Sequence, residues 1–79
     1  MVKKAVAERF KAICAERGIT ANELAVLAGV TPSSVYSMLD PRRREVTVNL
    51  VKKLCDGLSI TLGEFFDDEL FNELEPDPD

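Results

Sequence analysis

Threonine, glycine and proline residues divide this chain into short segments, each carrying apolar residues at helical spacing. The first segment, residues 3–17, lacks Gly and Pro, places Val6, Phe10 and Ile13 on one face, and stops at Gly18. No segment alternates apolar and polar residues as a half-buried strand does. The pattern predicts an all-α fold whose short helices share one core, since 79 residues allow little more than a single domain.

The expected starts of the later helices are four threonines: Thr20, Thr31, Thr47 and Thr61. The first and last of them precede a Glu by three residues, which is the capping-box pattern, and the second is followed by a proline. The third helix should end at Asp40, because Pro41 disfavours helical backbone in the residue before it. The residues expected to face the core are Leu24, Leu27 and Ala28; Val35, Met38 and Leu39; Leu50, Val51, Leu54, Cys55 and Leu58; and Leu62, Phe65 and Phe66.

The net charge of −4 hides an uneven distribution along the chain. Residues 1–63 contain all ten Lys and Arg and six of the fourteen acidic residues, whereas residues 64–79 contain eight acids and no base. The body is therefore basic and suits an anionic partner, while the C-terminal segment is acidic. We divide the chain into a folded domain over residues 1–66 and an acidic tail over residues 67–79.

The side chain that most often serves as a catalytic base or metal ligand is missing, and no pair of carboxylates is placed where a catalytic pocket would form. The chain has no His, which removes the commonest general base and the commonest metal ligand. Cys14 and Cys55 lack the CxxC spacing and fall on apolar stripes. We therefore expect two reduced, buried cysteines, no cofactor, no metal and no enzymatic activity.

Neither a membrane span nor a secretory signal is expected. No apolar run approaches the roughly 18–20 residues that span a bilayer. The N-terminal stretch MVKKAVAERF has no long apolar core of the kind that signal peptides carry. The expected location is the cytoplasm, away from membranes.

The strongest functional signal is the stretch TANELAVLAGVTPSSVYSML, residues 20–39. It predicts two short helices joined by a tight turn, where the small residues Ala25 and Gly29 let the helices approach closely. Val35 and Met38 should hold the second helix against the first, so that its outer face projects away from the core. A helix presented in this way fits the major groove of DNA.

The segment ELAVLAGVTPSSVYSML resembles the helix-turn-helix of the Cro and phage-repressor class of bacterial regulators, also called the XRE class. The following stretch VNLVKKLCDGLSITLGEFF is similar to the last two helices of the same domain, so the resemblance covers about residues 6–66. It implies a compact five-helix, lambda-repressor-like domain. It also implies a small transcriptional regulator that binds duplex DNA sequence-specifically, with a recognition helix over about residues 31–39 in the major groove.

The resemblance assigns roles to individual positions. Base reading falls to the start and outer face of the recognition helix, at Pro32, Ser33, Tyr36 and Ser37. Phosphate contacts fall to the N-terminus of the second helix and to the loop after the recognition helix, at Thr20, Ala21, Arg42, Arg43 and Arg44. Pro32 is better explained as a helix starter, whereas the exposed Tyr36 beside small polar residues favours a DNA contact.

Three features depart from the pattern of the class. Ala21 stands where many members have Gln, which predicts weaker anchoring of the DNA backbone. Cys14 and Leu39 stand where many members pair a buried Arg with a Glu, so we expect an apolar contact there. The base-reading side chains are short except for Tyr36, so specificity should lean on DNA shape, water or the thymine methyl group.

Two questions stay open at this point. The acidic tail is either inert, a lure for a basic partner, a shield for the basic face, or a homodimer contact through Leu70, Phe71 and Leu74. The dimer is favoured because the class binds paired half-sites. The alternative to DNA binding is a protein-interaction module, such as an antitoxin or a phage accessory protein, that keeps the fold.

Overall fold

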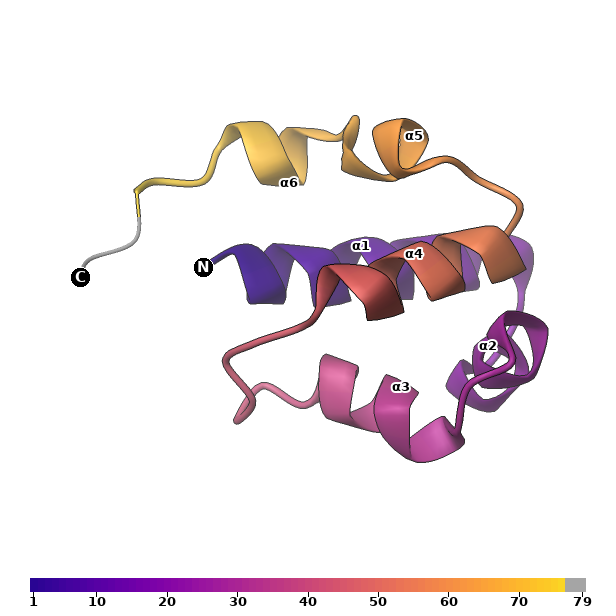
Figure 1. The fold of residues 1–79 in the computed structure, drawn as a ribbon. Helices are drawn as coiled ribbons and strands as arrows, with labels where there is room; N and C mark the ends of the chain where they lie inside the picture. Colours follow the sequence, from indigo (N-terminus) through magenta and orange to yellow (C-terminus); the bar gives the residue numbers. More distant parts are fainter. Residues whose placement is uncertain (77–79) are drawn as a thin grey trace.

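A computed structural model describes residues 1–76 of the chain, and all regular structure within them is α-helical. The helices, in chain order, are α1 (Val2–Arg17), α2 (Ala21–Ala28), α3 (Pro32–Leu39), α4 (Val48–Gly57), α5 (Leu62–Phe66) and α6 (Glu69–Asn72) (Figure 1). The all-α prediction is confirmed, with one short helix more than the five expected. The side chain of Asp68 caps this additional helix by accepting the N–H of Leu70 at 2.9 Å.

Each of the helices α2 to α5 begins directly after the expected threonine. In all four cases the threonine hydroxyl accepts the backbone N–H three residues further on. Glu23 and Glu64 complete the two predicted capping boxes by accepting the N–H groups of Thr20 and Thr61. A cap of this kind stabilises a helix by ~1 kcal/mol, which matters most for helices of only five to ten residues.

The first five helices each contribute at least one fully buried side chain to a single hydrophobic core. These side chains include Phe10, Leu24, Val35, Leu54 and Phe65. The rings of Phe10 and Phe65 have their centroids 4.3 Å apart. Helix α2 packs against α3 and α4, and α3 also packs against α1, so the position of α3 is set from two sides.

Two residues expected to face the core are exposed instead. Leu27 is 55% exposed and Phe66 is 40% exposed. A helix turns by about 100° per residue, so Leu27 lies on nearly the opposite side of α2 from the buried Ala25 and only at the edge of the face that contains Leu24. In the short helix α5, Phe65 takes the inward position and the next residue, Phe66, is turned out of the core.

The close approach between helices occurs at Gly57 rather than at Gly29. A Cβ atom on Gly57 would lie 2.8 Å from the backbone N and Cα of Ala28, so α4 packs directly against the end of α2. A Cβ atom on Gly29 would meet nothing within 4 Å. Gly29 has φ of +69° and is needed for the left-handed turn that ends α2, so its predicted packing role is wrong.

Two basic residues of α1 bind the carbonyl groups that follow other helices. Lys3 is only 5% exposed, and its ammonium group donates to the backbone carbonyl of Asp40, just after α3. The guanidinium group of Arg17 donates to the carbonyl of Leu58, just after α4. Helix C-termini carry partial negative charge, so a cation there is stabilised while its aliphatic stem stays buried.

The start of the acidic tail packs on the body of the protein. Arg9 of α1 donates to the carbonyl of Phe65 at 2.9 Å and lies 3.4 Å from the carboxylate of Asp68. The Phe71 ring lies 4.8 Å from the Phe66 ring, centroid to centroid, so Phe71 is partly buried within the chain. The boundary after residue 66 stays a prediction, and the last acidic residues, 77–79, lie outside the described part.

Both cysteines are free thiols, as expected. Cys55 is fully buried and Cys14 partly so, and burial raises the pKa of both thiols. Within residues 1–76, none of the helices is both long and apolar enough to cross a membrane. The same residues contain no group of three His, Cys, Asp or Glu side chains that could hold a metal ion.

Candidate functional site

Helix α3 has one buried face and one open face. Val35 and Met38 are 0% and 2% exposed and pack into the core, and Leu39 is half-buried at the end of the helix. The open face carries the four predicted base-reading residues, all of them exposed: Pro32, Ser33, Tyr36 and Ser37. Tyr36 is 52% exposed. The structure therefore gathers these four residues on one accessible surface.

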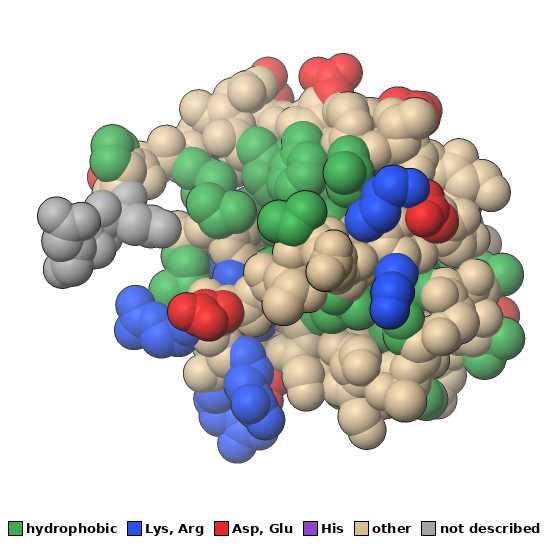
Figure 2. All heavy atoms as spheres, viewed as in Figure 1, with side chains coloured by type: hydrophobic (Ala, Val, Ile, Leu, Met, Phe, Trp, Pro, Cys, Tyr) green, Lys and Arg blue, Asp and Glu red, His purple; other side chains and the backbone are tan. Residues whose placement is uncertain are grey.

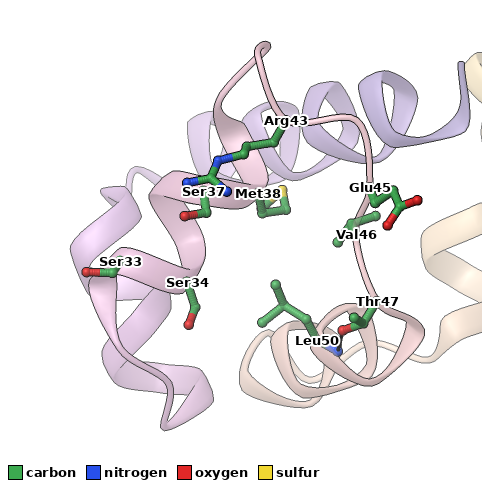
Figure 3. A pocket seen from close by; sticks show the side chains of 9 residues that line it. All are labelled: Ser33, Ser34, Ser37, Met38, Arg43, Glu45, Val46, Thr47 and Leu50. Atoms are coloured by element: carbon green, nitrogen blue, oxygen red, sulfur yellow. Dashed lines mark hydrogen bonds between the residues drawn. The ribbon is translucent and has the colours of Figure 1, made fainter.

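An open groove of about 350 Å³ separates α3 from the beginning of α4. Ser33 and Ser37 line it from α3, and Leu50 of α4 and Thr47, the residue that caps α4, line it from the other side (Figure 3). Arg43 extends from the intervening loop back toward α3 and lines the groove as well. The groove therefore combines polar side chains, one cation and an apolar wall.

Within residues 1–76, Arg42 is the one arginine of the loop after α3 that forms an ion pair. Its guanidinium group lies 2.9 Å from the carboxylate of Asp40, which also accepts the backbone N–H of Arg42 at 2.9 Å. These hydrogen bonds from Arg42 hold the pKa of Asp40 at about 2, well below its usual 3.8. Arg43 and Arg44 form no ion pair within the described part of the chain, so they have more charge to offer an anion.

The N-terminus of α2 is partly occupied by its own capping box. The hydroxyl of Thr20 accepts the N–H of Glu23, and the N–H of Thr20 donates to Glu23 Oε1, each at 3.1 Å. The N–H groups of Ala21 and Asn22 have no partner among residues 1–76. The structure thus leaves two N–H donors at the predicted phosphate site and places a carboxylate next to them.

Comparison with known proteins identifies the domain. Residues 9–70, which include most of α1 and reach into α6, match the Cro/C1-type HTH DNA-binding domain. The chain belongs to the Cro/C1-type helix-turn-helix family. The crystal structure of prophage Lp1 protein 11 is similar, with a TM-score of 0.82 and 30% sequence identity over 94% of this chain and 97% of that chain. No curated protein matches the chain significantly.

The charges of this Cro/C1-type domain are separated in space as well as along the chain. In Figure 2, acidic side chains lie along the top, over α5 and α6, whereas basic side chains gather at the lower left, around the loop after α3. Three cations of α1 are engaged within the fold, namely Lys3, Arg9 and Arg17. These three side chains are therefore less available to a partner, and Arg9 is also paired with the carboxylate of Asp68.

Several residues of the site were not anticipated from the sequence. Thr47 and Leu50 line the groove because α4 begins opposite α3, which no local pattern reveals. Ser34 also lines it, but its hydroxyl hydrogen-bonds the hydroxyl of Thr31 at 2.9 Å. Lys3 donates to the carbonyl group at the end of α3. The sequence shows only a long basic side chain near the start of a helix, which does not reveal this contact.

Proposed function

We propose that this Cro/C1-type protein is a transcriptional regulator that binds duplex DNA sequence-specifically, with α3 in the major groove. The observation that carries the proposal is the two-faced burial of α3. Val35 and Met38 fix the helix to the core, while Ser33, Tyr36 and Ser37 face solvent. The major groove of B-DNA admits a single helix, and hydroxyl groups can bond base edges directly or through water.

The phosphate contacts would come from both flanks of α3. At the N-terminus of α2, the free N–H groups of Ala21 and Asn22 suit an oxyanion, with Thr20 holding the helix start in place. On the other flank, Arg43 and Arg44 have no ion-pair partner in the described part of the chain, whereas Arg42 pairs with Asp40. Pro32 serves to start α3 rather than to read a base.

The salt dependence of binding tests the loop. Fluorescence anisotropy with a random-sequence duplex should show that R43Q/R44Q weakens binding to every duplex. Each lost phosphate contact reduces the slope of log K against log salt by about 0.9, so the pair should flatten it by nearly 2. Lys53→Gln, on α4 and outside the groove, should leave the slope as in wild type. An unchanged slope in R43Q/R44Q would refute the role of the loop.

Paired half-sites would require a dimer, and the exposed apolar residues of α5 and α6 offer a surface for one. Phe66 and Leu70 are 40% and 36% exposed. Phe71 packs against Phe65 and Phe66, and Leu74 is half-buried. These two side chains therefore offer less surface to a second subunit than Phe66 and Leu70 do. We therefore propose a homodimer through Phe66 and Leu70, a refinement of the Leu70, Phe71 and Leu74 surface expected from the sequence.

One observation favours the alternative function as a protein-interaction module. Val26 and Leu27 on α2 are 78% and 55% exposed and, with Ile19, line an apolar hollow of about 420 Å³. The DNA-binding proposal gives this surface no role. A gel shift with random duplex at low salt separates the two functions, since an interaction module would give no shift at any protein concentration.

A further inference from the structure

A second groove runs along α1 beneath the end of α3, apart from the open face of α3. It consists of a hollow of about 350 Å³ near the start of α1 and another of about 280 Å³ farther along the helix. Lys11 and Leu39 line both hollows, so the two adjoin each other. Ligand pockets begin at roughly 300 Å³, so the groove is large enough for a small organic molecule.

The first hollow is cationic. Among residues 1–76, the cations Lys3, Lys4, Lys11 and Arg43 and the carboxylate of Glu8 line it. Lys3 donates to the carbonyl of Asp40, but the other three cations have no ion-pair partner within residues 1–76. The cations outnumber the carboxylate of Glu8 around this hollow, so an anion placed there would be attracted to it.

The second hollow is apolar. Ile19, Ala21 and the shared Leu39 line it above the fully buried Phe10 and Leu24. Among residues 1–76, the only charged group at this hollow is Lys11, at the junction. Cys14 also lines it, and its thiol is partly buried. An apolar tail placed in this hollow would contact α1, α2 and α3 at once.

We propose that this groove binds a small amphipathic anion. Its apolar tail lies in the hollow beside Cys14, and its carboxylate or phosphate lies among Lys4, Lys11 and Arg43. A bare inorganic anion would fill only the first hollow, and a neutral apolar molecule only the second. The backbone of duplex DNA offers phosphates but no apolar tail. Only a molecule that joins both chemistries uses the whole groove.

Such a ligand would be coupled to the recognition face. Arg43 lines both this groove and the groove between α3 and α4, and Leu39 is the last residue of α3. An anionic headgroup that engages Arg43 withdraws that guanidinium from DNA. Bound ligand therefore lowers the affinity for DNA, and bound DNA lowers the affinity for the ligand by the same factor.

Binding to the full chain can be measured without DNA. The probes are octanoate and octyl phosphate, with acetate and 1-octanol as the two halves of the ligand tested separately. Iodoacetamide labelling of Cys14 reports on the second hollow, and the fully buried Cys55 serves as the internal reference. We expect octanoate or octyl phosphate to slow the labelling of Cys14 saturably, whereas acetate and 1-octanol do so weakly or not at all.

Two variants assign the binding to the groove. K4Q/K11Q removes exposed charges without touching the core and should weaken binding of the effective probe by about tenfold. Lys53→Gln should bind as wild type does. Ala21→Leu, which fills the second hollow, should abolish the protection of Cys14. In wild type, saturating probe should lower the affinity for a random duplex in an anisotropy assay.

Three results would overturn the proposal. The first is that neither anionic probe protects Cys14. The second is any sign that the anionic headgroup does not contribute to binding. Such a sign would be that 1-octanol protects Cys14 as well as octanoate does, or that K4Q/K11Q binds the probe as tightly as wild type. The third is that K4Q/K11Q lowers DNA affinity and the salt slope while no probe binds, which would assign these lysines to the DNA interface.

Discussion

Asp40 connects the end of α3 to the loop that follows it. Its backbone carbonyl accepts the ammonium group of Lys3, and its carboxylate accepts both the backbone N–H and the guanidinium group of Arg42. Because its pKa is held at about 2, this carboxylate stays ionised at any pH at which DNA binding is measured. As far as the structure describes the chain, the loop therefore presents two arginines without an ion-pair partner and one, Arg42, with a permanent counter-charge.

Asp40→Asn should raise the affinity for DNA modestly. Asn keeps an oxygen that can accept the N–H of Arg42, but it removes a negative charge from the proposed interface.

The same substitution, Asp40→Asn, should lower the thermal stability of the protein. A carboxyl group whose pKa falls from 3.8 to about 2 on folding stabilises the protein above pH about 4, and this contribution disappears as the pH falls through about 2. The Tm difference between wild type and Asp40→Asn should shrink over that range; a difference that is constant with pH would contradict the ion pair.

Glu23→Gln should strengthen DNA binding while leaving the helix start intact. Gln at the third helical position can still complete the capping box with Thr20. Loss of the carboxylate removes a repulsion of about 1 kcal/mol or less toward a nearby phosphate. Glu69→Gln is the matched control, since α6 lies on the opposite side of the molecule from α3 (Figure 1). Equal effects of the two substitutions on the anisotropy titration would argue against phosphate binding at the N-terminus of α2.

At the scale of the helices, start and stop signals could be predicted well because they are local. The four threonine caps, the left-handed glycines at 18 and 29 and the end of α3 at Asp40 each depend on a few neighbouring residues. The faces of the longer helices were also predicted. Leu27 and Phe66 were not, because helices of eight and five residues have too few turns for periodicity to place every apolar residue.

What could not be predicted depends on residues far apart in the chain. Lys3 and Asp40 are 37 positions apart, and Arg17 and Leu58 are 41 apart. The exposure of the predicted base-reading residues followed from the pattern of α3 alone. The groove they share with Thr47 required the position of α4, which only the tertiary packing sets.

Gly57→Ala should destabilise the fold, although Ala is the better helix former. Its Cβ atom would lie 2.8 Å from backbone atoms of Ala28, so α2 and α4 must separate. Overpacking of this kind costs about 1–3 kcal/mol in the free energy of unfolding. Gly63→Ala in α5 is the matched control, because its Cβ atom would meet only the Thr61 hydroxyl oxygen, at 3.7 Å. Urea denaturation of both variants tests this, and equal midpoints would contradict the close packing.

At the scale of the whole molecule, two opposite sides of the protein carry opposite charge. The loop after α3 gathers basic side chains, and the acids of α5 and α6 lie on the other side of the protein (Figure 2). The described part of the acidic segment therefore leaves the open face of α3 uncovered. This arrangement favours a dimer contact at α5 and α6 over a shield for the recognition helix.

Leu70→Glu and Phe71→Ala should separate association from stability. Leu70 is 36% exposed, so Leu70→Glu should shift analytical ultracentrifugation profiles toward monomer while the monomer stays folded. Phe71 packs against two rings, so Phe71→Ala should lower the free energy of unfolding by about 2 kcal/mol. If Leu70→Glu associates as wild type does, the dimer uses another surface.

The most direct test is a selection of bound duplexes from a random pool, performed with wild type and with Tyr36→Ala. Docking of α3 in the major groove predicts an enriched sequence built from half-sites about 10 base pairs apart. It also predicts that Tyr36→Ala changes which bases are enriched within each half-site, since the exposed face of α3 reads them. Recovery of a pool no different from the starting one with wild type would contradict the account.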